Sequence, residues 1–472
     1  MSSKRRNRSD VFARAFKSRC IIILGVILSY NIIPDFDPGH DVVPFIPFRD
    51  VRDHWGVALV GGFTRWDAAR FLNLAWDPKI RSNVYHLGDG YPERKGREGT
   101  GHYYLGRNIV LDEILQHSTV RNSVLSYFPK VYYERRWHKL IQAEEAHAFF
   151  PLWPNTIRFF SSKLFASHSN SKILEATFYV AAAIAVNICY FCLAAICLDE
   201  LCNDLLLYYT RQNVNLPANL NSTLYFTENE LLEAVNYFIW NPANVFFVGC
   251  YSESSFSFLT FAGYMFHTKS INSNSLKMIF LYQTLVLLTF VLSGLTRSNG
   301  FFCVGYFVIY IIMIAIQRLN GNANLRRAAH FICCLSSVVL LYPMWSHNCS
   351  GYYHLCTKAV HSREYCKSSP KFDVFNISTI YSFVQKKHWG VGAFRFYALK
   401  QTPNFLLASP IIFITVCVGL IHLSYLKNQI FRSNLKTSLL RWSSDIILAH
   451  SSVLAVSLLV CLVFAHIHIT TR

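Results

Sequence analysis

The stretch ILEATFYVAAAIAVNICYFCLAAICL, residues Ile173–Leu198, contains a single charged side chain and exceeds the roughly 20 residues that a helix needs to cross a bilayer. Similar apolar runs occupy Leu276–Gly294, Phe301–Ile316, Phe331–Trp345, Phe405–Tyr425 and Ile446–Ile467. Weaker runs lie at Cys20–Ile33, Leu231–Cys250 and Phe256–Phe266. Together these runs predict an all-α polytopic membrane protein with about nine transmembrane helices.

The composition agrees with this class of protein. Hydrophobic residues make up 52% of the 472 residues and charged residues only 15%, against roughly 25% charged residues in soluble domains. The net charge is +18, but the basic residues are spread among loops and are not gathered with aromatics on one soluble domain. We therefore predict no nucleic-acid partner. The sequence has no P-loop, dinucleotide turn, zinc-protease motif or nucleophile elbow, which disfavours those enzyme classes.

Basic residues also predict the orientation in the membrane. The head, residues 1–19, is rich in Lys and Arg and should stay cytoplasmic. With nine spans, the basic loops Gln317–Arg327 and Lys427–Arg441 also fall in the cytoplasm. The expected order is a first transmembrane helix at 20–34, a lumenal loop at 35–171 with interfacial helices and a flexible insertion near 85–136, transmembrane helices at 172–345, a lumenal loop at 346–403, and C-terminal transmembrane helices at 404–472.

The predicted lumenal loops carry possible modification sites. Asn348 and Asn376 each begin an N-x-S sequon and are candidate glycosylation sites. Cys349, Cys356 and Cys366 share one loop, where oxidising conditions would permit one disulfide among the three. The remaining cysteines lie mostly within apolar runs, so we interpret them as core thiols and predict no metal site.

The first candidate for chemistry is Asp67, in the segment Thr64-Arg65-Trp66-Asp67-Ala68-Ala69-Arg70-Phe71-Leu72. A carboxylate beside a bilayer surface is where an enzyme with a lipid-borne substrate would keep its base. Residues 65–75 have helical spacing, which predicts a short helix in the membrane interface. An ordinary amphipathic connector is the alternative interpretation.

Other polar residues recur where predicted spans end, where they are expensive near lipid unless they serve a site. They are Glu144, Glu145 and His147 before Phe149-Phe150-Pro151; Glu253 in Tyr251-Ser252-Glu253-Ser254; and Arg297 in Thr296-Arg297-Ser298-Asn299-Gly300. Aromatics, carboxylates and an arginine at one membrane face suit a substrate with a sugar, a phosphate and a lipid tail. Each also has a structural alternative: a snorkelling Arg297, a helix-capping Glu253, a solvated acidic pair, and an interfacial belt for His147 and the aromatics.

In this order the motifs resemble the GPI mannosyltransferase 2 family, the second mannosyltransferase of glycosylphosphatidylinositol anchor biosynthesis. The matching blocks are Arg65-Trp66-Asp67-Ala68 with Phe71-Leu72; Ala148-Phe149-Phe150-Pro151 with Pro154; Asn241-Pro242-Ala243-Asn244-Val245-Phe246 with Tyr251-Ser252-Glu253; Thr296-Arg297-Ser298-Asn299-Gly300; and Ile380-Tyr381-Ser382 through Trp389, Val391-Gly392, Tyr397, Leu399-Lys400-Gln401 and Pro403-Asn404-Phe405-Leu406-Leu407-Ala408.

The resemblance implies a glycosyltransferase of the C type (GT-C) in the endoplasmic reticulum membrane, multi-pass, with a lumenal active site. Its donor would be dolichyl-phosphate-mannose and its acceptor the first mannose of the GPI precursor glycolipid, joined by an alpha-1,6 bond. Such a transfer requires no cofactor or metal. The family also implies that a small accessory membrane subunit is a possible partner.

The chemistry then suggests roles. A beta-linked donor and an alpha-linked product require one inverting displacement, for which one base suffices; we assign it to Asp67, with Glu144 as a second catalytic candidate. The leaving phosphate needs a cation, and Arg297 ranks first because its fork suits phosphate. The further substrate-binding candidates are Arg65, Trp66, Glu253, Asn299, Arg395, Lys400 and Gln401.

Two other functions fit the sequence. Arg70, where members of the family often have histidine, and the long 85–136 stretch also allow a lipid-linked sugar transferase with a different acceptor. A polytopic transporter or a non-catalytic assembly subunit is the second alternative. A transporter would favour charges near mid-bilayer and paired halves, whereas here the charges lie at span ends.

Overall fold

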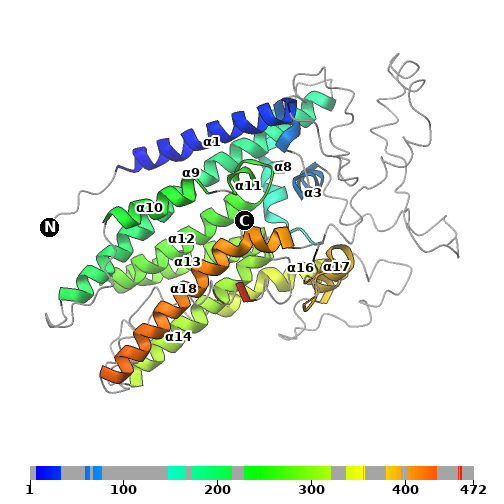
Figure 1. Ribbon diagram of the computed structural model, residues 1–472. Coiled ribbons are helices and arrows are strands. Elements are labelled where there is room, and N and C mark those ends of the chain that lie inside the picture. The colour runs from blue at the N-terminus through cyan, green and yellow to red at the C-terminus, as the bar shows by residue number, and fades with distance from the viewer. Residues whose placement is uncertain are drawn as a thin grey trace, which may run out of the picture.

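The computed structural model of the protein describes residues 7–32, 59–63, 67–76, 147–165, 172–214, 228–241, 243–319, 336–353, 356, 379–394, 397, 399, 402–432, 455 and 458–459. Every regular element in these ranges is helical, as predicted. Figure 1 shows long helices running alongside one another, with short helices gathered at one end. The elements are α1 (Arg8–Ile32), η2 (Gly61–Phe63), α3 (Asp67–Trp76), α8 (Leu152–Phe165), α9 (Lys172–Val214), α10 (Glu228–Ile239), α11 (Asn244–Val248), α12 (Glu253–Asn272), α13 (Leu276–Thr296), η6 (Ser298–Phe302), α14 (Cys303–Leu319), η7 (Ser336–Leu341), α16 (Tyr342–Tyr352), α17 (Thr379–Trp389) and α18 (Thr402–Arg432).

The centre of the bundle is formed by α9, α12 and α13. Helix α12 packs against both of the others, and the next helix, α14, adds an aromatic cluster in which Phe290 meets Tyr306 and Phe307. Gly263 on α12 permits this packing, because a Cβ there would overlap the Phe290 ring. Helices that are apolar on most sides need such neighbours or lipid around them.

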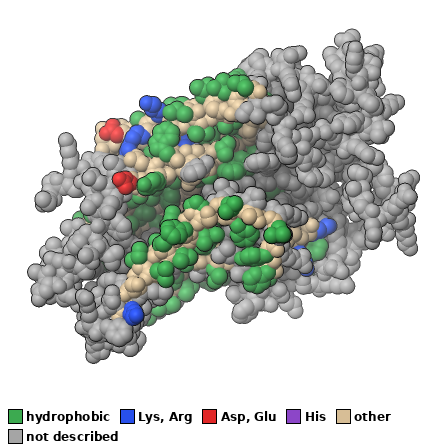
Figure 2. All heavy atoms as spheres, viewed as in Figure 1, with side chains coloured by type: hydrophobic (Ala, Val, Ile, Leu, Met, Phe, Trp, Pro, Cys, Tyr) green, Lys and Arg blue, Asp and Glu red, His purple; other side chains and the backbone are tan. Residues whose placement is uncertain are grey.

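Two described helices are long and apolar enough to be candidate membrane spans, Thr177–Tyr208 and Leu276–Thr296. Shorter apolar helices cover Ser298–Ile312 and Ala408–Ile421. Figure 2 shows apolar side chains along the described helices and charged ones mostly near their ends. The helical class is confirmed, and the number of spans stays a prediction; most of Ile446–Ile467 lies outside the described residues.

Helix α1 begins at Arg8, well before the apolar run at Cys20. Part of the predicted basic head is therefore packed against the bundle: Val11 and Ala15 are buried. Arg8 Nε lies 2.7 Å from Glu200 Oε1 on α9. Lys269 Nζ, at the end of α12, lies 3.3 Å from the other Glu200 oxygen and 2.8 Å from Asp204 Oδ2. The Arg8–Glu200 ion pair gives the first turn of this longer helix a fixed partner.

The predicted span at 231–250 is interrupted in the structure. Helix α10 ends at Ile239 and the short α11 begins at Asn244; the sequence between them contains a proline, which cannot donate a helical hydrogen bond. Buried side chains satisfy the freed carbonyls. Arg19, fully buried on α1, donates to Ile239 O at 3.0 Å and Asn244 O at 3.2 Å. Asn187 on α9 donates to the carbonyls of Gly249 and Tyr251.

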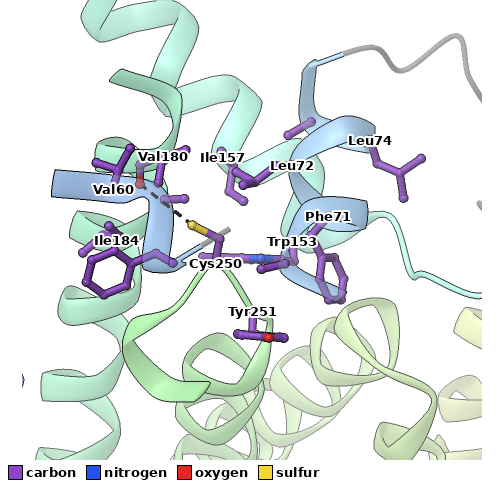
Figure 3. Packing of buried hydrophobic residues seen from close by; sticks show 14 of the residues in the cluster. Val60, Phe71, Leu72, Leu74, Trp153, Ile157, Val180, Ile184, Cys250 and Tyr251 are labelled. Atoms are coloured by element: carbon purple, nitrogen blue, oxygen red, sulfur yellow. Dashed lines mark hydrogen bonds between the residues drawn. The ribbon is translucent and has the colours of Figure 1, made fainter. Parts of the chain in front are cut away.

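At one end of the bundle, α3 and α8 cover the start of α9. Figure 3 shows Phe71 and Leu72 of α3 near Trp153 of α8, with Cys250 and Tyr251 beside them. The helix predicted from the spacing of residues 65–75 is confirmed from Asp67 onward. Its apolar residues Ala68, Phe71, Leu72, Leu74 and Ala75 are buried. The helix therefore buries its apolar face against protein.

Candidate functional site

The structure describes the side chains of Glu253, Arg297, Asn299 and Asn348 among the predicted site residues. For Asp67 it describes the backbone, at the first position of α3. The others lie outside the described residues: Arg65, Trp66, Glu144, Asn376, Arg395, Lys400 and Gln401.

Glu253 and Arg297 form an ion pair. Glu253 is the first residue of α12 and Arg297 follows the last residue of α13; these helices are joined by a short turn at their other ends, so antiparallel packing brings the two positions together. Arg297 Nη1 lies 2.6 Å from Glu253 Oε1. The carboxylate side chain is 4% exposed and the guanidinium side chain 21%. Arg297 therefore does not snorkel away from the bundle, and its charge is held at a partly open position.

The surroundings of Glu253 include polar atoms without a partner. Its second oxygen, Oε2, and the neighbouring Ser252 Oγ are buried and make no hydrogen bond in the structure as described. Ser252 precedes α12 but its side chain does not cap the helix. Buried polar groups in native proteins are nearly always hydrogen-bonded to protein or water. These two atoms can therefore accept or donate hydrogen bonds to a bound molecule or water, as a sugar hydroxyl requires.

The turn after Arg297 is tightly packed. Gly300 lies against the backbone of Gly294, where a Cβ would overlap main-chain atoms. Thr260 and Ser293 hydroxyls, 3.1 Å apart, join α12 to α13 close to this turn. Only glycine fits at position 300, so the sequence Arg297-Ser298-Asn299-Gly300 fixes the path of the chain directly beside the ion pair. Asn299, a predicted substrate-binding residue, is half-buried there.

Tyr381 connects this turn to α16 and α17. Its hydroxyl donates to Ser298 Oγ at 2.8 Å, and its backbone N–H donates to Asn348 Oδ1 at 3.1 Å. The latter contact caps the first turn of α17, whose N–H groups have no partner within the helix. Burial raises the pKa of the Tyr381 phenol, and the contact with Ser298, the charge of Arg297 and the Gln385 side chain oppose this shift only in part. The phenol is therefore a hydrogen-bond donor at neutral pH.

An aromatic and histidine cluster lies behind Tyr381. Phe150 stacks on His347 with ring centroids 4.3 Å apart, and its edge contacts Tyr381 at 5.7 Å. His347 Nε2 lies 2.7 Å from the carbonyl oxygen of His147, so this nitrogen carries the hydrogen. His147 is buried rather than placed in an interfacial belt. The Phe149-Phe150 segment is thus fixed between α16 and α17.

Two packing contacts join α3, which begins with Asp67, to this site. Phe71 contacts Phe149 edge-on at 5.0 Å, next to the Phe150 cluster. Leu72 shares a buried cluster with Cys250 and Tyr251, which directly precede Ser252 and Glu253 (Figure 3). The structure therefore brings α3, the Glu253 segment and the Arg297 turn to one end of the bundle.

Three further predictions concern this end. Among the described residues no group of three His, Cys, Asp or Glu could hold a metal ion. Cys356 is disulfide-bonded and Cys349 is a free thiol, so the pairings that involve Cys349 are excluded; Cys366 lies outside the described residues. Asn348 is buried and both of its amide atoms are hydrogen-bonded, to Met344 O and to the Tyr381 N–H; this geometry disfavours the glycan predicted there from the sequon.

Sequence reasoning did not assign a role to Ser298, Tyr381, Phe150 or His347. The first three lie inside the motifs quoted above, so the sequence indicated their segments. It did not indicate which residues pair, because the Tyr381 contact with Ser298 joins residues far apart in the chain.

Comparison with known proteins identifies the family of the chain. The mannosyltransferase (PIG-V) family matches residues 113–472, most of the chain. A Drosophila melanogaster protein named GPI mannosyltransferase 2 is 24% identical over 356 residues, covering 71% of this chain and 72% of that protein. Proteins of the same name from Drosophila pseudoobscura pseudoobscura (26% over 385 residues, 77% of each chain) and Saccharomyces cerevisiae (27% over 340 residues, 70% of this chain and 68% of that one) are also similar. No solved structure matches. The chain is a glycosyltransferase and belongs to the mannosyltransferase (PIG-V) family.

Proposed function

We propose that the protein transfers mannose from dolichyl-phosphate-mannose to the first mannose of the GPI precursor glycolipid, forming an alpha-1,6 bond. The relatives that share most of its length are named GPI mannosyltransferase 2, which supports GPI-anchor mannosyl transfer. The observation that carries the proposal is the Glu253–Arg297 ion pair at 2.6 Å. It places a guanidinium and an unpartnered carboxylate oxygen at the end of the bundle where α3 begins with Asp67.

The proposed reaction is a single displacement with inversion. The acceptor hydroxyl oxygen attacks the anomeric carbon of the donor, the bond from that carbon to the phosphate oxygen breaks, and dolichyl phosphate leaves. Asp67 takes the hydroxyl proton as general base, an effect typically worth about a hundred- to ten-thousand-fold in rate. Arg297 compensates the negative charge of the phosphate. No step requires a metal or a cofactor.

Glu253 has two tasks in this proposal. Its Oε1 atom holds Arg297 in place, and its Oε2 atom accepts a hydrogen bond from a sugar hydroxyl. A pair that was fully buried and neutralised would serve only the fold, whereas the Arg297 side chain is 21% exposed. The remaining predicted residues keep their proposed roles: Glu144 as a second carboxylate, and Arg65, Trp66, Asn299, Arg395, Lys400 and Gln401 as contacts to substrate.

The proposed setting is a multi-pass GT-C enzyme of the endoplasmic reticulum membrane with a lumenal site. Support comes from α12, which has a cluster of paired charges at each end. Lys269 pairs with Glu200 and Asp204 at one end, and Glu253 pairs with Arg297 at the other. These clusters are about 25 Å apart along the helix axis, close to the thickness of a hydrocarbon core. The Cys356 disulfide suits an oxidising compartment. A small accessory membrane subunit belongs to the same proposal.

Complementation tests the proposal. Cells deficient in GPI mannosyltransferase 2 would receive the wild-type chain, Asp67→Asn, or Asp10→Asn, which changes an exposed aspartate on α1 and serves as the control. Surface GPI-anchored protein and accumulated lipid intermediates are measured. We expect rescue by wild type and Asp10→Asn and none by a stably expressed Asp67→Asn. Rescue by Asp67→Asn would remove this residue from the chemistry, and failure of the wild-type chain at normal expression would favour another acceptor.

A further inference from the structure

The Ser298 hydroxyl has a defined direction. A serine hydroxyl has one hydrogen to donate and two lone pairs to accept. Tyr381 Oη donates to Ser298 Oγ at 2.8 Å, which occupies one lone pair and turns the Ser298 hydrogen away from the tyrosine. Ser298 makes no other side-chain hydrogen bond in the structure as described. Its hydrogen is therefore available at the half-open turn that begins with Arg297.

Tyr381 is itself held so that it donates rather than accepts. Its backbone N–H is bound by Asn348 at 3.1 Å and its ring packs against Phe150. Burial raises the pKa of the phenol, so its hydrogen is retained at neutral pH. The Tyr381 hydroxyl therefore donates to Ser298 from a fixed position.

The Ser298 hydroxyl lies beside a cation. Arg297 precedes Ser298, and its Nη1 lies 2.6 Å from Glu253 Oε1. An arginine with a neighbouring hydroxyl donor is suited to a tetrahedral anion, because each group can bind a different oxygen.

We propose that Ser298 binds the phosphate of the lipid-linked sugar donor beside Arg297, and that Tyr381 is a positioning residue that turns the Ser298 hydroxyl toward it. This inference rests on the proposed function and adds to it a second phosphate ligand and the residue that aims it. The acceptor glycolipid also contains a phosphate diester, so the shared chemistry is a phosphate diester and the experiment separates the two sources.

The experiment uses membranes of deficient cells that express the full chain. Mannose transfer is measured with dolichyl-phosphate-mannose varied at fixed acceptor, and then with the acceptor varied at fixed donor. The variants are Ser298→Ala, Ser298→Thr, Tyr381→Phe and the double variant Ser298→Ala with Tyr381→Phe. Ser382→Ala, an exposed position on α17, is the control.

We expect Ser298→Ala to raise the donor KM by about 10- to 100-fold, the range of one hydrogen bond to a charged group. Tyr381→Phe should raise it in the same direction, Ser298→Thr should retain activity, and the double variant should be no worse than Ser298→Ala. The acceptor KM should not change in any variant.

Each other outcome rejects one part of the proposal. An unchanged donor KM in Ser298→Ala rejects the phosphate ligand, and it does so even where Tyr381→Phe fails to fold. A raised acceptor KM instead assigns the phosphate to the acceptor and rejects the donor site. Effects that multiply in the double variant show that Tyr381 does not act through Ser298. If the wild-type chain transfers no mannose from dolichyl-phosphate-mannose, the proposed function itself fails.

Discussion

Replacement of Arg19 by methionine tests the buried contacts at the break between α10 and α11. Methionine keeps an unbranched apolar stem but removes the guanidinium, which donates to Ile239 O at 3.0 Å and Asn244 O at 3.2 Å and lies 3.7 Å over the Phe191 ring. The Ile239 carbonyl retains one donor, the Asn244 side chain at 3.1 Å. The variant therefore leaves two buried carbonyls with one donor fewer each.

The expected loss of stability follows from these contacts. Removing one partner from a buried charged pair costs about 3–5 kcal/mol. Here the remaining partners are neutral carbonyls, and losing the buried charge recovers its desolvation cost, so we expect about 2–3 kcal/mol. Arg19→Lys keeps a charge but loses the forked geometry and should fall between wild type and Arg19→Met.

The assay is thermal unfolding of detergent-solubilised, fluorescently tagged protein, followed by the fraction that remains monodisperse after heating. Arg19→Met should lower the apparent melting temperature by several degrees. Lys17→Met, an exposed basic residue on the same helix, is the control and should match wild type. If Arg19→Met and Lys17→Met have the same apparent melting temperature, the break between α10 and α11 does not depend on the arginine and our account of α1 is wrong.

Three further outcomes are expected. Gly300→Ala should abolish complementation because the added methyl overlaps backbone, whereas Gly305→Ala, with open space around its Cβ, should be tolerated; equal activity of the two would contradict the tight turn. Asn348→Gln should leave the glycosidase-sensitive mass of the protein unchanged, since its amide is buried and hydrogen-bonded, while Asn376→Gln should reduce it; a mass loss with Asn348→Gln would show a glycan there. Burial raises the pKa of the Cys349 thiol, so its alkylation, followed by mass spectrometry, should be slow at pH 7 and increase with pH beyond the ordinary thiol pKa of about 8.5; a rate that levels off below pH 8 would contradict this.

The sequence predicted the helices well where a local pattern determines them. Helices α9 and α13 follow long apolar runs, and α3 follows the spacing of small and apolar residues after Asp67. The break after Ile239 had a sequence signal in its Asn-Pro pair, but the apolar count across 231–250 outweighed it. A proline in an apolar run therefore indicates where a buried donor is needed, as Arg19 provides here.

The residues of the candidate site were found one by one, without their partners. Glu253 and Arg297 were each predicted because a charge at the end of an apolar run is costly, yet their ion pair depends on the antiparallel packing of α12 and α13. Arg19 was interpreted as a charge that sets orientation. Its acceptors are backbone carbonyls, which have no signature in the sequence, so its burial could not be predicted. The same holds for Tyr381, whose hydrogen bond reaches Ser298, 83 residues away.

The long separation between Arg19 and its acceptors has a consequence for biosynthesis. Arg19 and Ile239 are 220 residues apart in the chain, and ribosomes add about 5–20 residues per second. The arginine is therefore synthesised roughly 10–40 s before the carbonyls that accept its hydrogen bonds. During that interval α1 has no native acceptors for its guanidinium, so its final placement must wait for α10 and α11. Chains that terminate before Asn244 should accordingly be recognised as incomplete and degraded.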